Sequence, residues 1–310
     1  MTTTTRALGE TAAEMAGNIW RGYSTRDRTL LTIGSIVCWV LFVTIGKLFG
    51  IPPVPGYQAS LLASGSMLMS IVLAGVTFVA CVLIGSLISG AVHFEGGLFC
   101  ASVGMLALST RGGAMRYVLM YAGGAGIYFS LLVELVLLAG IVCIGWNVLI
   151  GLRNAGYLHA EPLRDDDPDA MPAQGAMALV GQVILMIFLM ALLAQSDRKA
   201  QVIWSVGLSS FLAALAAHSL FPARPSAWFW SAPLIVGGIG YTLAWFGGPP
   251  GVGGTIGGLL PALARPLPLD YAAAGTAGAL YGYWTSRKWL HEHEDEPHTT
   301  GEVEEAVEGQ

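Results

Sequence analysis

The chain has 310 residues, of which 54% are hydrophobic and 11% are charged, and its net charge is −5. Soluble domains carry about 25% charged residues, so this composition excludes an ordinary soluble domain. The sequence contains no basic stripe of the kind that binds nucleic acid, so we expect no nucleic-acid partner.

Long, almost uncharged apolar blocks alternate with short polar breaks over residues 30–290, which predicts a transmembrane helical domain. A bilayer core about 30 Å thick needs roughly 20 apolar residues of helix to cross it. The backbone must satisfy its own polar groups in lipid, and unbroken apolarity excludes the alternating strands of a barrel. We therefore predict an all-α, polytopic membrane protein. Five blocks are long enough to span: 30–50, 67–92, 176–194, 202–221 and 228–247.

The polar segment 1–29 precedes the first apolar block and contains four arginines, which favours a cytoplasmic N-terminus. Its apolar residues recur at helical spacing, which is compatible with a helix lying in the membrane interface and equally with a solvated arm. We expect a multi-pass protein of the cell inner membrane. A hydrophilic loop is predicted at 153–172, and an acidic, disordered tail at 291–310.

The number of spans is open between seven and eight. The apolar stretch 117–151 would make a helix about 52 Å long, so we expect a break at its glycine cluster and a span from about residue 127. The blocks 98–109 and 251–264 are short, as in re-entrant or interfacial segments, and 271–289 is a credible last span. Counting positive charges gives nine inside and six outside for either number of spans. Eight is preferred, because the C-terminal flank is then basic on the inside.

Ionisable residues inside apolar blocks are candidate functional groups, because a charge at the bilayer centre costs at least about 2.5–3.5 kcal/mol. Glu134 has no charged neighbour in its block, so a partner must come from another helix. It is interpreted either as a proton or cation relay or as a hydrogen-bonded structural residue. His218, His93 and Glu95 lie near the ends of blocks and are weaker candidates.

A loop rich in glycine and proline precedes the last block, and it contains Arg265 and Asp270 as a candidate pair. Asp270 is placed to cap the helix expected from residue 271. In that helix Ala274, Gly278 and Gly282 form a small-residue face, which permits close helix packing. No motif predicts a catalytic site, a cofactor or a metal centre, and the four cysteines read as small buried hydrophobes.

Three functions are compatible with these patterns. A non-enzymatic membrane subunit or scaffold is favoured, with the lipid bilayer as its environment and small-residue faces binding other subunits or a second copy. The alternative is a permease for a small solute or ion, with a polar path that joins Glu134 to Gln182, Ser209 or Ser210. A membrane-embedded enzyme is the third, and it requires His93, Glu95 or His218 to converge in one cavity.

Overall fold

The computed structural model describes residues 25–48, 61, 67–90, 93–122, 126–158, 172–247 and 262–294. These residues are helical with short connections, and none of them forms a strand. The helices are α2 (Thr25–Leu48), α3 (Met67–Ser89), α4 (Gly96–Arg111), α5 (Met115–Ala122), α6 (Gly126–Asn154), α7 (Pro172–Leu193), α8 (Lys199–Leu220), α9 (Ala227–Phe246), η2 (Ala262–Ala264), α10 (Pro268–Asp270), η3 (Tyr271–Gly275) and α11 (Thr276–Glu294).

Six of these helices are long and apolar enough to cross a membrane: α2, α3, α6, α7, α8 and α9. The all-helical, membrane-compatible fold is therefore confirmed, whereas only six of the expected seven or eight spans meet this test within the described residues. The expected break in the stretch 117–151 is present, because α5 ends at Ala122 and α6 begins at Gly126. The possible interfacial helix of the N-terminal segment and most of block 251–264 lie outside the described residues.

Two boundaries can be compared with the prediction, and one of them differs. The last helical stretch begins at Pro268 and reaches Glu294, so residues 291–294 belong to a helix and not to the tail. At the other boundary α6 ends at Asn154, close to the predicted start of the hydrophilic loop. Gly156 has a φ of 77° there, and its N–H bonds to the Arg153 carbonyl while that of Tyr157 bonds to Leu152. This double cap needs a residue that tolerates positive φ, which glycine does.

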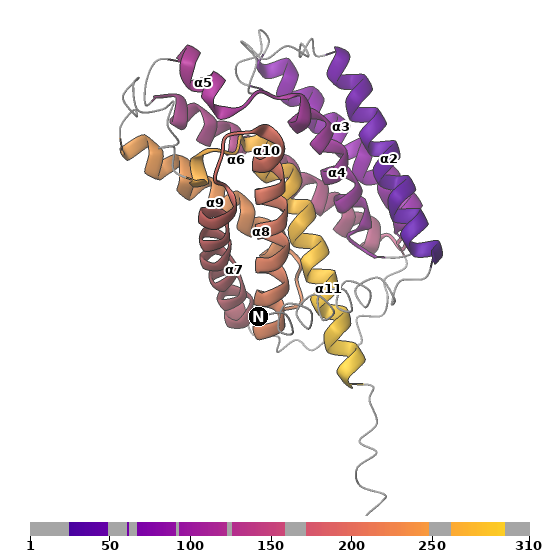
Figure 1. The fold of residues 1–310 in the computed structure, drawn as a ribbon. Helices are drawn as coiled ribbons and strands as arrows, with labels where there is room; N and C mark the ends of the chain where they lie inside the picture. The colour runs from indigo at the N-terminus through magenta and orange to yellow at the C-terminus, as the bar shows by residue number, and fades with distance from the viewer. Residues whose placement is uncertain are drawn as a thin grey trace, which may run out of the picture.

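Two of the helices that fail the span test, α4 and α11, lie inside the bundle. Helix α4 packs against α2 and α3, and α11 packs mainly against α8 and also against α9 and α4. In Figure 1, α11 passes through the middle of the bundle, beside α8. Exposed large apolar side chains are frequent on the six apolar helices, whereas α4 has none and α11 has only Leu290. The outer six helices therefore shield α4 and α11 from the surroundings.

Close contact between the backbones of α8 and α11 explains how α11 packs inside the bundle. A Cβ atom on Gly278 would lie 2.3 Å from the carbonyl oxygen of Gly207, and one on Gly282 would lie 2.3 Å from that of Phe211. Both acceptors belong to α8, so the small-residue face predicted from the sequence exists. It is filled by a helix of the same chain and is therefore closed to another subunit.

Successive helices alternate in direction. Arg111 at the end of α4 donates to the Val43 carbonyl near the end of α2, so these helices run the same way. The start of α4 instead meets the end of α3, where a Cβ on Gly97 would lie 2.1 Å from the Ser86 hydroxyl. We call the two ends of the bundle the Asp270 side and the Trp284 side. Helices α2, α4, α7 and α9 run toward the Asp270 side, and α3, α6, α8 and α11 run away from it.

Candidate functional site: a buried ion pair at the start of the last helix

The segment that leads into the last helix is set deep in the bundle by small residues of α9. A Cβ on Gly237 would lie 2.7 Å from the ring of Tyr271, and one on Gly240 would lie 2.5 Å from the Leu263 carbonyl oxygen. Side chains at these two positions would displace the segment. The chain of α9 thus provides the groove in which residues 262–275 lie.

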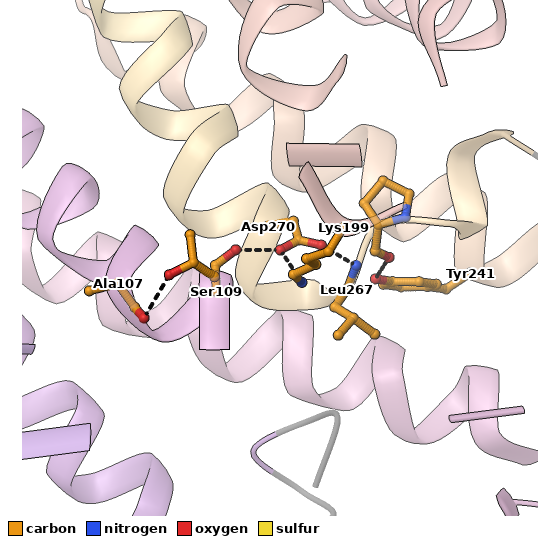
Figure 2. Close-up of polar contacts among 8 residues, drawn as sticks. Ala107, Ser109, Lys199, Tyr241, Leu267 and Asp270 are labelled. Carbon is orange, nitrogen blue, oxygen red and sulfur yellow. Dashed lines mark hydrogen bonds and ion pairs between the residues drawn. The ribbon is translucent and has the colours of Figure 1, made fainter. Parts of the chain in front are cut away.

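Asp270 is fully buried, and both of its carboxylate oxygens are engaged (Figure 2). Its Oδ1 accepts a hydrogen bond of 2.5 Å from the Ser109 hydroxyl at the end of α4 and one of 2.7 Å from the ammonium of Lys199, the first residue of α8. Its Oδ2 accepts a bond of 2.8 Å from the backbone N–H of Leu267. One carboxylate therefore joins α4, α8 and the start of the last helix.

The helix-capping role expected for Asp270 takes a different form. The helix begins at Pro268, three residues earlier than the apolar run suggested, and proline suits a first helical position because its missing N–H needs no partner there. Asp270 is the third residue of this helix, and its side chain reaches back to the N–H of Leu267. A carboxylate at this position also interacts favourably with the helix dipole.

The expected pairing of Arg265 with Asp270 is replaced by the pairing with Lys199. The guanidinium of Arg265 is buried and donates to the carbonyl of Ala194, just after α7. That carbonyl is left without an intrahelical partner at the helix C-terminus, where a positive charge is favourable. Arg265 thus attaches the loop to α7, while Lys199 neutralises the acid.

Two tyrosines complete the surroundings of Asp270. The Tyr241 hydroxyl donates to the Pro266 carbonyl at 2.6 Å, and the Tyr271 hydroxyl donates to the Leu263 carbonyl at 2.7 Å. Immediately after Asp270 the helix widens into the five-residue π-helix η3, whose residues are all buried. Short π-helical turns are frequent at functional sites.

Glu134 lies inside the bundle, with 1% of its surface exposed. Its Oε1 accepts a hydrogen bond of 3.3 Å from the backbone N–H of Leu61, in the connection between α2 and α3. This donor is a backbone amide in a connection between helices, and the partner from another helix that the sequence predicts stays a prediction. The polar residues expected to continue a path from Glu134 each bond to a backbone carbonyl instead: Gln182 to Phe229, Ser209 to Val206 and Ser210 to Gly275.

The remaining candidates gather around the end of α11 on the Trp284 side. The ring of His93 stacks on that of Trp284 at 4.4 Å, and the Trp284 indole N–H donates to Glu95 at 3.2 Å. His218 meets the same helix two residues further on, where its Nδ1 hydrogen-bonds to the Ser286 hydroxyl at 3.0 Å. The three candidates thus contact one helix: His93 and Glu95 both contact Trp284, and His218 contacts Ser286.

His93 is held in its neutral form. Burial lowers its pKa to about 4, since the charged imidazolium loses water there, and the nearby positive charge of Arg287 lowers it further, against a smaller opposing effect of Asp27. A neutral imidazole can stack on the Trp284 indole without the energetic cost of burying a charge. This arrangement favours a packing role for His93.

The described residues do not bring three histidine, cysteine or carboxylate side chains together as a metal site would require. Three cysteines, Cys38, Cys81 and Cys100, are buried among α2, α3 and α4, and Cys143 is exposed on α6. No family model matches the chain, and no curated protein and no solved structure matches it. The function of the protein is therefore inferred from its site alone.

Sequence reasoning identified Asp270 but missed Lys199 and Ser109. Lys199 stands in a polar break between two apolar blocks, where a lysine is ordinarily solvated, and Ser109 has no local feature of note. The one sequence feature that pointed to a basic partner was Asp270 itself. A carboxylate next to an apolar run needs a counter-charge, and the bases that begin or end neighbouring blocks are the candidates to supply one.

Proposed function

We propose that the protein is a permease for a small solute, in which the Asp270–Lys199 pair is the charged element that responds to the transported species. The observation that carries this proposal is a fully buried carboxylate whose ammonium partner comes from a different helix. Removing two charges from water costs several kcal/mol per ion, so a buried pair contributes little net stability compared with apolar packing. Its presence in a bundle of membrane helices supports a role in transport.

The position of the pair supports a mechanism. Transporters commonly bind their substrates and coupling ions where a membrane helix is interrupted, because the interruption frees polar backbone groups. Asp270 lies at such an interruption, between the extended residue Leu267 and the π-helix η3. Loss of its negative charge would break the ion pair that joins the start of α8 to the start of the last helix, so one local event could change how these two helix ends lie.

A scaffold explains the same features less well. The scaffold interpretation relied on small-residue faces that would bind other subunits, and the Ala274–Gly278–Gly282 face is filled by α8 of the same chain. Apolar side chains packed as tightly would join α4, α8 and the last helix without a buried charge. The ion pair is therefore better explained by a role in transport than by a role in binding other subunits.

We further propose that eight helical segments cross the bilayer, namely the six apolar helices together with α4 and the stretch from Pro268 to Glu294. The alternating directions of these eight segments support this topology. It puts both termini on the Trp284 side, with nine Lys and Arg residues there against six on the Asp270 side. Of those six, Lys199 and Arg265 are engaged in internal contacts. The positive-inside rule then makes the Trp284 side cytoplasmic.

Accessibility labelling tests the topology. Tyr157 on the Trp284 side and Gln195 on the Asp270 side are both exposed, so Tyr157→Cys and Gln195→Cys are placed in a variant whose four native cysteines are replaced by serine or alanine. In intact cells a membrane-impermeant maleimide should label residue 195 and leave residue 157 unlabelled until the membrane is opened. Labelling of residue 157 in intact cells would overturn the proposed orientation.

Uptake into liposomes tests the function. The purified protein is reconstituted and offered a panel of radiolabelled amino acids, sugars, carboxylates and amines, with protein-free liposomes as the blank. At least one solute should enter in a protein-dependent, saturable way, and Lys199→Met should lose that uptake. The matched control is Asp197→Asn, which removes the exposed ion pair between Asp197 and Arg116 on the same side. Failure of the folded protein to take up any of these solutes would reject the permease.

A further inference from the structure

We infer that the ion coupled to transport is a proton bound by Asp270, and that the site does not take a metal cation. This inference rests on the proposed permease function. It follows from which atoms surround the carboxylate. Within the described part of the chain, three groups contact its oxygens and all are hydrogen-bond donors: the Ser109 hydroxyl, the Lys199 ammonium and the Leu267 amide.

A metal cation requires the opposite surroundings. Hard cations such as Mg²⁺ and Ca²⁺ take six or more oxygen ligands, each of which must present a lone pair. Here the Lys199 ammonium lies 2.7 Å from Oδ1 of Asp270, in the position that a metal cation would occupy. Two like charges at that spacing repel strongly in a poorly hydrated interior.

Three backbone carbonyls of the described residues in this region already accept hydrogen bonds. The carbonyls of Pro266 and Leu263 accept hydrogen bonds from the hydroxyls of Tyr241 and Tyr271. The Ala194 carbonyl accepts one from the guanidinium of Arg265. A cation that displaced these donors would leave them unsatisfied at a cost of about 1–3 kcal/mol each.

A proton requires a smaller rearrangement, in which the Ser109 hydroxyl turns and the Lys199 ammonium loses its partner. When the Asp270 carboxylate takes up H⁺ from water it becomes a carboxylic acid, which can donate to the Ser109 oxygen in place of accepting from its hydroxyl. The ammonium of Lys199 then loses its ion pair. The Lys199 side chain is 19% exposed, so its charge can be hydrated once the pair is broken. Release of the proton restores the pair, and no other reactant is consumed.

The charged and titratable groups around Asp270 set the conditions for this exchange. Among the described residues they are Lys199 of α8, Tyr241 of α9, Tyr128 and Glu134 of α6, and Arg265 and Tyr271 of the segment itself. Of these groups Lys199 is the cation in direct contact with the carboxylate, so the proton competes with Lys199 above all.

Uptake of the solute identified in the liposome panel tests the inference under two separate gradients. With the inside of the liposomes alkaline relative to the outside, accumulation is expected, whereas an inward Na⁺ gradient at equal pH should produce none. Asp270→Asn should abolish the response to the pH gradient, whereas the matched control Asp197→Asn should retain it. Accumulation driven by Na⁺, or a persistent pH response in Asp270→Asn, overturns the inference and leaves the permease standing. Absence of any uptake rejects the permease instead.

A second measurement does not depend on transport. Infrared difference spectra of the detergent-solubilised protein between acid and neutral pH should contain the C=O stretch of a buried protonated carboxylic acid. That band should be absent in Asp270→Asn and unaffected by added Na⁺. Asp270→Asn removes the ion pair that joins α8 to the last helix and could unfold, so the double variant Asp270→Asn/Lys199→Met is measured beside it. A band that survives in both variants overturns the assignment to Asp270.

Discussion

Replacing Gly278 by alanine should destabilise the protein although alanine is the better helix former. The added Cβ would lie 2.3 Å from the Gly207 carbonyl oxygen, and ordinary contacts begin at 3.4 Å. The oxygen belongs to the backbone of α8 and cannot rotate away. Helices α8 and α11 must therefore separate by about 1 Å, which forfeits about a quarter to a half of the dispersion energy of the atom pairs that face each other there.

The magnitude follows from two opposing effects. Overpacking of this kind costs about 1–3 kcal/mol. The helical preference of alanine over glycine offsets up to about 1 kcal/mol of that. A net loss of about 1–2 kcal/mol in the free energy of unfolding is expected. It should be measured by reversible unfolding in mixed micelles of a mild detergent and SDS.

Two matched controls isolate the contact. A Cβ on Gly140 in α6 would meet nothing within 4 Å, and one on Gly207, directly across the interface, would lie 3.7 Å from its nearest neighbour. Gly140→Ala and Gly207→Ala should each leave stability unchanged or raise it. If Gly278→Ala were as stable as the wild type, close backbone packing of α11 on α8 would not be what holds the last helix in place.

Three further perturbations separate structural from functional roles. Glu134→Gln should retain the acceptor for the Leu61 amide and be tolerated, whereas Glu134→Leu should cost about 1–3 kcal/mol of unfolding free energy; equal stability of the two variants would contradict this bond. His93 has a folded pKa of about 4 against about 6.5 when unfolded, so the unfolded chain binds the extra proton and stability should fall as the pH drops from 6.5 toward 4. His93→Gln should flatten that part of the thermal-stability profile, and an unchanged slope would assign it to another group. Ser286→Ala should cost about 1 kcal/mol in thermal unfolding, because His218 and Ser219 both bond to that hydroxyl, and no change would show that water replaces it.

The apolar blocks predicted most of the fold because lipid-facing helices must be uniformly apolar over a fixed length. The break between α5 and α6 was also predictable, since a single helix of that length cannot fit one bilayer. Helices α4 and α11 were harder to interpret. Helices that contact only other helices need neither full length nor strong apolarity, so hydropathy understates them.

The site was predictable only in part. Asp270 and Glu134 stood out as acids in or beside apolar sequence, and the structure buries both. Their partners could not be derived from spacing, because Lys199 is 71 residues away from Asp270 and Leu61 is 73 residues away from Glu134. Such pairings depend on which helices become neighbours. The Arg265–Asp270 pairing was preferred because it was close in sequence, and the real partner lay across the bundle.

Shielding of α4 and α11 from the surroundings has a consequence for biosynthesis. The machinery that inserts nascent chains recognises a segment by how readily it partitions into lipid, and neither of these helices is built to face lipid. Each should enter the bilayer poorly when tested alone, and should depend on neighbours that are already there. Helix α11 is synthesised after all of its partners, so those neighbours are present when it inserts. Helix α4 precedes four of the six outer helices, so only α2 and α3 are available to hold it in the bilayer when it is made. Chains shortened after α4 are therefore expected to adopt mixed orientations that the complete protein does not have.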